Sequence, residues 1–360
     1  MVNIRELREG LWTFPIVLPD NPLKWLNCYV VKGCPDVNGG RSLLIDTGFN
    51  RADCFNELLE GMNSLGLDPG MTDVFLTHIH SDHTGNAARL FRLGCRIFMS
   101  ETDYELSSIE ERIRWKRGAD RICMEGMPDG IISRIYSQDS SIVNIAGYFD
   151  AMPLHEGDAM RYGKYEFECI MTPGHTPGHM CLYERRAKIM LLGDHVLFDI
   201  TPNICAWTGV PDSLRDYLIS LDKISRYEVD LPLPGHRSIP DGKTMNERIH
   251  ELNAHHEKRL VEILSILRIY PEVDAYFIAS RMTWKIHAQD WETFPPSQQY
   301  FAMSEALSHL DYLLSENLIT RKDTADNRRL YSLTAEYSAD EGHSRAKTEP
   351  DRHAAVHSEY

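Results

Sequence analysis

THIHSDHTGN, residues 77–86, is the stretch of this sequence that is richest in metal-binding chemistry. It follows the apolar run DVFL and places three imidazoles and one carboxylate within six positions. Side chains alternate along an extended segment, so His78 and His80 point the same way and can reach one metal ion together. Asp82 and His83, one turn further on, can then face a second ion. A surface histidine cluster without metal is the alternative.

Three later motifs place further ligand types after apolar, strand-like runs. MTPGHTPGH puts His175 behind one run, LLGDH puts Asp194 behind the next, and LPGH puts His236 behind a later one. With the first motif, four strand ends are expected to converge on one rim. Imidazole and carboxylate ligands suit zinc, and also iron or manganese, and a catalytic site keeps one position open for water.

Taken together, these motifs resemble those of the metallo-β-lactamase superfamily. The HxHxDH run, the later TPGHTPGH, a GD that ends an apolar strand and a final PGH occur in the family's order, over roughly residues 10–240. The resemblance implies an α/β fold, an αββα sandwich with the metals at one edge. Flavodiiron reductases typically carry Glu in place of His80, and the commonest zinc β-lactamases use Cys in place of Asp194. The pattern is most similar to the glyoxalase II-like and lactamase-beta-2-like hydrolases.

Carried over residue by residue, the resemblance implies a ligand set for each metal. The first ion would take His78, His80 and His175. The second would take Asp82, His83 and His236, and Asp194 would bridge both ions. Asp46 in LIDTG resembles a residue that steadies the ligand loop, with a solvated strand-ending Asp as its alternative. Trp207 is a candidate substrate contact, and a buried packing role is its alternative.

This ligand set predicts a hydrolase with two divalent metal ions, most readily Zn²⁺, with Fe or Mn as alternatives. A metal-bound hydroxide would attack a thioester or related ester carbonyl, as in acyl-CoA or acyl-glutathione, with Asp82 and Asp194 as catalytic carboxylates. The same site on this fold also serves lactones, β-lactams and phosphodiesters. A lactonase or β-lactam hydrolase and a phosphodiesterase or ribonuclease therefore stay open. A non-catalytic, metal-stabilised interaction module is the alternative from another class.

Composition limits the partners and the compartment. The 360-residue chain has 38 Lys and Arg against 53 Asp and Glu, a formal net charge of −15. This charge repels phosphate backbones and anionic lipids, so we expect a small-molecule substrate, no membrane partner and no nucleic acid, and we leave a homo-oligomer open. The eight cysteines form no CxxC pair and the N-terminus lacks an export signal, so we expect a cytoplasmic protein.

The chain is longer than a typical single domain, so we expect one large domain and a smaller one. Residues 1–243 alternate β-branched runs with helical segments and form the predicted catalytic domain. A mainly helical insertion at 101–150 could be a lid or an extra helical layer. Residues 244–335 predict three helices and a hairpin, a winged-helix-like unit whose recognition helix lacks Lys and Arg. Residues 336–360 are polar and predict a disordered tail.

Overall fold

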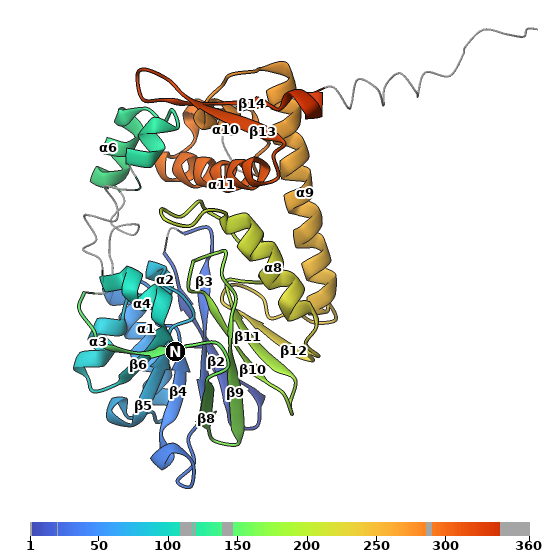
Figure 1. Cartoon of the computed structure of the whole chain (residues 1–360). Helices are drawn as coiled ribbons and strands as arrows, with labels where there is room; N and C mark the ends of the chain where they lie inside the picture. Colours follow the sequence, from blue (N-terminus) through green and yellow to red (C-terminus); the bar gives the residue numbers. More distant parts are fainter. Residues whose placement is uncertain are drawn as a thin grey trace, which may run out of the picture.

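The computed structural model describes residues 2–19, 21–108, 118, 120–138, 147–285 and 290–338. Two β-sheets pack face to face, and helices cover both outer faces (Figure 1). The predicted αββα sandwich is therefore confirmed. A second, mainly helical unit lies above the sandwich in Figure 1.

The first sheet contains seven strands that follow one another in chain order. They are β1 (Arg5–Arg8), β2 (Leu11–Val17), β3 (Trp25–Val31), β4 (Ser42–Ile45), β5 (Thr72–Phe75), β6 (Arg96–Ser100) and β7 (Ala151–Leu154). The strands from β1 to β4 pair antiparallel, and those from β4 to β7 pair parallel. The parallel strands β4, β5 and β6 therefore end at the same edge of the sheet.

The second sheet has the order β12-β11-β10-β9-β8. Its strands are β8 (Ala159–Tyr162), β9 (Tyr165–Met171), β10 (Met180–Glu184), β11 (Ile189–Gly193) and β12 (Leu231–Pro234). β11 and β12 pair parallel, whereas β10 pairs antiparallel with both β9 and β11. β9, β11 and β12 consequently run in one direction, so the segments that follow them leave the sheet at a common edge.

The strands of the second sheet are apolar on both faces because the sheet is buried on both sides. Leu182 and Leu191 pack between the two sheets, while their neighbours Cys181 and Met190 pack against the outer helices. The helices on the two outer faces are α1 (Ala52–Ser64), α3 (Ala87–Arg92) and α4 (Glu101–Ser108) on one side, and α8 (Ser213–Ser225) with the start of α9 (Met245–Ile269) on the other. This double burial explains the continuous apolar runs in the sequence.

The C-terminal unit contains the three predicted helices and the predicted hairpin. After α9 come α10 (Ala275–Arg281), α11 (Pro296–Ser315), β13 (Ile319–Asp323) and β14 (Arg329–Leu333). α9 begins with a capping box in which Thr244 and Glu247 bond each other's backbone amides. The winged-helix assignment and the domain boundaries stay predictions. Of the predicted tail, only residues 336–338 lie among the described residues.

Part of the predicted insertion packs into the C-terminal unit. Residues 120–124 are helical, α6 spans Asp129–Gln138, and the apolar side chains of Ile122, Ile131 and Ile135 join the core of α9, α10 and α11. The buried carboxylate of Glu125 pairs with Arg329 Nη1 at 2.9 Å and accepts a bond from Tyr331 Oη at 2.8 Å. The chain therefore crosses to the helical unit and returns before β7. Residues 109–117, 119 and 139–146 of the insertion lie outside the described part.

Short helical turns complete the described secondary structure. They are α2 (Ser81–Thr84) and the 3₁₀ turns η1 (Asn38–Gly40), η2 (Pro69–Met71) and η3 (Trp291–Thr293). Within the described ranges, no helix combines the length and apolar character that crossing a bilayer requires.

Candidate metal centre

The seven predicted metal ligands lie on segments that follow four strands. These are β5, followed by His78, His80, Asp82 and His83; β9, followed by His175; β11, followed by Asp194; and β12, followed by His236. The common direction of β9, β11 and β12 places the last three ligands at one edge of the second sheet. The convergence of four strand ends on one rim is thus present in the structure.

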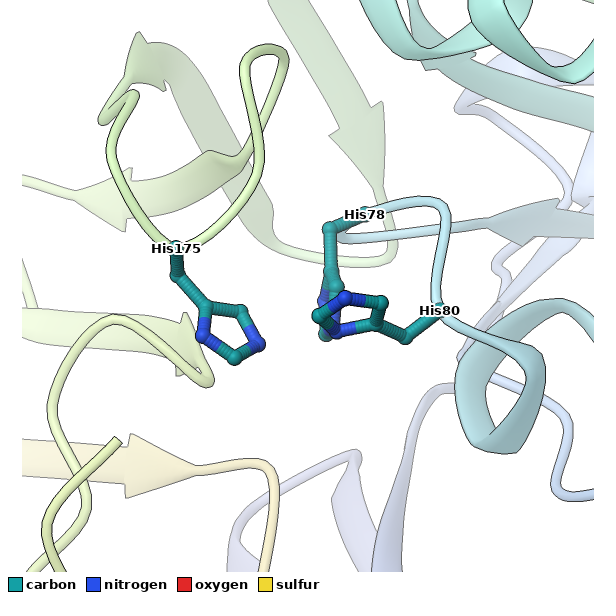
Figure 2. A group of neighbouring side chains, drawn as sticks. All are labelled: His78, His80 and His175. Carbon is teal, nitrogen blue, oxygen red and sulfur yellow. The ribbon is translucent and has the colours of Figure 1, made fainter. Parts of the chain in front are cut away.

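The ligand atoms gather in three overlapping groups, and within each group they lie within 4.8 Å of one another. The groups are His78, His80 and His175; His78, His83 and Asp194; and Asp82, His83 and His236. Figure 2 shows the ring of His175 pointing toward the rings of His78 and His80. His78 Nε2 and His80 Nδ1 lie 3.0 Å apart, as the alternation of an extended segment predicts. Two groups match the ligand sets that the resemblance implies.

Asp194 lies between these two sets. Its Oδ2 is 3.3 Å from His236 Nε2 and 3.7 Å from His175 Nε2, and its Oδ1 is 3.5 Å from His83 Nε2. A single carboxylate therefore reaches imidazoles of both sets, which is the geometry that a bridging ligand needs. The residue is only 4% exposed.

Hydrogen bonds outside the centre fix the orientation of several rings. His175 Nδ1 donates to the carbonyl of Asn203 at 2.8 Å, and His236 Nδ1 donates to the carbonyl of Trp25 at 3.0 Å. Because a carbonyl only accepts, each of these Nδ1 atoms carries the proton. The Nε2 atoms of both rings therefore present lone pairs to the centre, as metal ligands do.

The donor set fits a bound cation. His83 Nδ1 donates to Asp46 Oδ2 at 2.7 Å, so His83 Nε2 faces the centre and presents a lone pair there when it carries no proton. This atom lies only 3.1 Å from His236 Nε2, and both rings are buried. Two lone pairs at this distance repel unless a positive charge lies between or beside them. His175 Nε2 is likewise buried without a hydrogen bond from the described residues.

Electrostatics in the centre favours positive charge. Burial alone lowers the pKa of His236, but the carboxylates of Asp194 and Asp82 raise that pKa to about 9. The same carboxylates would stabilise a metal ion. On the other side of the centre, burial and then the neighbouring His175 lower the pKa of His80 to about 3, so this ring is neutral and free to coordinate at neutral pH.

Asp46 supports the ligand segment in the way that the resemblance implies. Its Oδ1 accepts the Thr77 amide at 2.9 Å, and its Oδ2 accepts Thr77 Oγ1 at 2.9 Å and His83 Nδ1 at 2.7 Å. The residue has φ +60°, a left-handed conformation that costs roughly 1–3 kcal/mol outside glycine and persists only where contacts enforce it. These contacts make Asp46 our proposed positioning residue for His83.

Trp207 lies against the first set of ligands. Its Nε1 donates to the carbonyl of His175 at 3.1 Å, and its ring stacks on the ring of His80 with centroids 5.9 Å apart and planes 25° apart. A substrate contact by Trp207 stays a proposal. His179 is not in any ligand group, because its Nδ1 bonds Thr172 Oγ1 and its Nε2 accepts the backbone amide of Asp194 at 3.2 Å. It therefore positions the backbone of Asp194.

Asp103 is a residue of this site that sequence reasoning missed. Its buried carboxylate accepts the Ile79 amide at 2.8 Å, Thr176 Oγ1 at 2.7 Å and the Gly178 amide at 2.7 Å. It thus joins the segment that carries His78 to the segment that carries His175. Its place directly after β6, the parallel neighbour of β5, is the signal that could have identified it.

We expect the variant Asp103→Asn to bind zinc about 10–100-fold more weakly than the wild type, as is usual when a group that orients ligands is lost. An amide has one acceptor oxygen, so its NH₂ group must face one of the amides of Ile79 and Gly178. An unsatisfied buried amide also costs about 1–3 kcal/mol of folding free energy. Zinc competition against a chelator and thermal unfolding measure both effects. The exposed Glu105→Gln on the same helix is the control, and wild-type zinc affinity in Asp103→Asn would contradict the assignment.

The region that carries the proposed ligands is similar to known proteins. A family model described as the metallo-beta-lactamase superfamily matches residues 26–118 and 155–236, which include all seven proposed ligands and Asp46. An uncharacterised protein of Aquifex aeolicus is 29% identical over 179 residues, 49% of this chain and 68% of the relative. An atrochrysone carboxyl ACP thioesterase of Aspergillus fumigatus is 28% identical over 258 residues, which cover 70% of this chain and 64% of the relative, less than two thirds of its length.

Two solved structures resemble the whole chain. A metallo-beta-lactamase family protein from Thermus thermophilus has a TM-score of 0.74 and 26% sequence identity, covering 91% of this chain and 100% of the other. A beta-lactamase domain protein from Burkholderia ambifaria has the same TM-score and 25% identity, covering 92% of this chain and 94% of the other. Both similarities extend well beyond the residues that the family model matches.

Proposed function

Because the chain belongs to the metallo-beta-lactamase superfamily, whose members are generally hydrolases, we propose that it is a dinuclear metal-dependent hydrolase of thioesters. The observation that carries the proposal is the convergence of buried imidazole and carboxylate groups whose lone pairs face one another. The substrate is a small molecule, and zinc is the proposed metal, with iron or manganese as alternatives for the same ligands.

Seven side chains would hold the two ions in this proposal. His78, His80 and His175 would hold the first ion, and Asp82, His83 and His236 would hold the second. Asp194 would be shared by both. When bound, the two ions would polarise a carbonyl oxygen and lower the pKa of a coordinated water to about 7, so that hydroxide is available at neutral pH.

The side chains of the centre have separate tasks. Asp194 keeps the two ligand sets in one place, because it contacts imidazoles of both. Asp82 Oδ2 lies 3.2 Å from His236 Nε2, and its ionised carboxylate could take up the proton released by the attacking water and pass it to the leaving group. Trp207 covers one face of the His80 ring and so limits the access of bulk water from that side.

Two considerations favour a thioester among the possible acyl substrates. A thiol has a pKa near 8.5, so a thiolate leaves with little help from a proton donor. The two carboxyl groups of the proposed ligand set, Asp82 and Asp194, have lowered pKa values and are therefore poor proton donors. A relative that is 28% identical has a name that states thioesterase activity toward an acyl carrier protein. Hydrolysis would convert the thioester and one water into a carboxylic acid and a free thiol.

The rival functions have less support. A nuclease that docks its substrate through α11 would need basic residues on that helix, but α11 contains no Lys or Arg and carries Glu305 and Asp311. Lactones and β-lactams require no such helix, and the same centre could open them. A binding module without catalysis would have no use for a water-activating centre.

The test is metal content by elemental analysis on the same sample as a screen for thiol release. The screen uses acyl-CoA, acyl-glutathione and acyl-pantetheine thioesters, with a lactone and bis(p-nitrophenyl) phosphate beside them. We expect about two metals per chain and turnover of one thioester class. Two metals with turnover of the lactone or the phosphodiester alone would exclude the thioester assignment. A protein without metal, purified in the absence of chelators, would exclude the hydrolase proposal itself.

A further inference from the structure

Residues 201–207 lie between β11 and α8 in the chain and contact both the catalytic sandwich and the helical unit. They have no regular secondary structure, so no helix or sheet ladder holds their backbone in place. Contacts from outside must therefore decide where their carbonyl groups point. Ile204 is fully buried in the core beneath α8, and Ala206 packs against the core of the helical unit.

On one side, this segment contacts the first set of ligands. The Asn203 carbonyl accepts the Nδ1 proton of His175 at 2.8 Å, which fixes the tautomer and the direction of that ring. Trp207 Nε1 returns a bond to the carbonyl of His175 at 3.1 Å, and the Trp207 ring stacks on His80. Two residues of the first set, His175 and His80, thus contact residues 201–207.

On the other side, the segment is bonded to α11. The Ala206 amide donates to the Ser304 carbonyl at 3.1 Å, and Asn203 Nδ2 donates to the Phe301 carbonyl at 3.4 Å. Ser308 Oγ donates to the Ile204 carbonyl at 2.5 Å, which is closer than its second acceptor, the Glu305 carbonyl of α11 at 2.8 Å. Positions 301, 304 and 308 recur at the spacing of one helix face. Ser308 is fully buried and supplies the only side chain of α11 in these three bonds.

The second set of ligands is oriented differently. His83 is held by Asp46, which follows β4, and His236 is held by the carbonyl of Trp25 in β3. Both supports belong to the first sheet. Among the described contacts of these two rings, none involves residues 201–207 or α11. The two sets therefore depend on different parts of the molecule.

We infer that the helical unit is a structural part of the first metal subsite, in which Ser308 of α11 positions the 201–207 segment and, through the Asn203 carbonyl, His175. The inference rests on the ligand assignment of the proposed function and is independent of which ester is cleaved. It predicts an asymmetry between the two ions. A substitution that loosens the contact between α11 and residues 201–207 lowers the affinity for the first ion and leaves the affinity for the second unchanged.

The test compares Ser308→Ala with the wild type, both as full-length protein loaded with two equivalents of Zn²⁺ and titrated with a chromophoric chelator. In Ser308→Ala we expect the chelator to remove one ion at about tenfold lower concentration than in wild type. This is the low end of the loss of metal affinity that follows the removal of an orienting group. The other ion should be removed at the wild-type concentration. Ser280→Ala is the matched control, because its hydroxyl donates to the Phe277 carbonyl within α10. Ser308→Thr keeps the hydroxyl and should restore wild-type release.

Three outcomes would overturn the inference. Unchanged release of both ions in Ser308→Ala is the first. The second is that Ser308→Ala binds both ions equally more weakly and loses as much thermal stability as Ser280→Ala does. That result would indicate general destabilisation. If Ser308→Ala does not fold, Asn203→Ala replaces it as the test variant. It removes the bond from Asn203 Nδ2 to the Phe301 carbonyl and should likewise lower the affinity for one ion only. The third is wild-type protein that binds no Zn²⁺, which would overturn the ligand assignment as well, whereas the first two leave that assignment intact.

Discussion

Asp194→Asn is expected to lower thioester turnover by about a thousandfold or more, which corresponds to about 4 kcal/mol of lost transition-state stabilisation. Asparagine has nearly the same shape as aspartate, so the packing around position 194 should survive. The variant loses the charge that lies within 3.7 Å of imidazoles of both ligand sets, and its NH₂ group cannot coordinate a metal. Initial rates of thiol release measure the effect, and elemental analysis of the same sample reports how many metals stay bound.

The matched control for this substitution is Asp222→Asn. Asp222 lies on α8, is largely exposed and pairs with Arg226, so it reports the effect of removing one carboxylate charge outside the centre. Its turnover should stay within about twofold of the wild type, because most surface substitutions have small effects. Turnover of Asp194→Asn within tenfold of this control would contradict the bridging assignment.

Removal of the metals is expected to abolish turnover and to lower the thermal stability of the catalytic sandwich. Without a metal ion, only a proton can separate His83 Nε2 from His236 Nε2, which lie 3.1 Å apart in a buried site. A ligand present at a thousand times its Kd stabilises the native state by about 4 kcal/mol, and that contribution disappears with the metal. For a domain of this size the loss corresponds to a decrease in Tm of roughly 10 °C.

Differential scanning calorimetry with and without a chelator measures this change, and added Zn²⁺ should restore both Tm and turnover. Asp194→Asn serves as the control here as well, since a weakened site should show a smaller shift on chelation. A Tm that is unaffected by the chelator, with metal shown to be absent, would mean that the centre contributes nothing to stability. That result would contradict the proposed contribution of the metals to the stability of the sandwich.

The sequence alone was sufficient to predict the sandwich and its family. The reason is local: each motif follows directly on an apolar run, so strand and ligand are read from adjacent residues, as in DVFL before His78 or IMLLG before Asp194. The alternation of side chains along an extended segment likewise predicts that His78 and His80 face one way. The distance of 3.0 Å between His78 Nε2 and His80 Nδ1 agrees with this expectation. The role of both residues as metal ligands stays a proposal.

Other parts of the site depend on contacts between residues that are far apart in the chain. Asp103 bonds the amide of Gly178, 75 positions away, and Ser308 bonds the carbonyl of Ile204, 104 positions away. Neither residue belongs to a motif. The place of Asp103 shortly after β6 is the one signal for it, and nothing marks Ser308 as different from other polar residues on a helix. The same holds for residues 120–138, which the sequence predicts as an insertion and the structure packs partly into the core of the helical unit.

The sequence by itself therefore determined which residue types form the proposed centre and the order along the chain of the strands that carry them, because both depend on short segments. The tertiary structure decided which groups hold those side chains in place and that residues 201–207, which contact His175 and His80, are bonded to α11. The physical reason is that hydrogen bonds between remote segments form only once the sheets have packed, and backbone carbonyls such as those of Asn203 and Trp25 leave no trace in the identity of their residues.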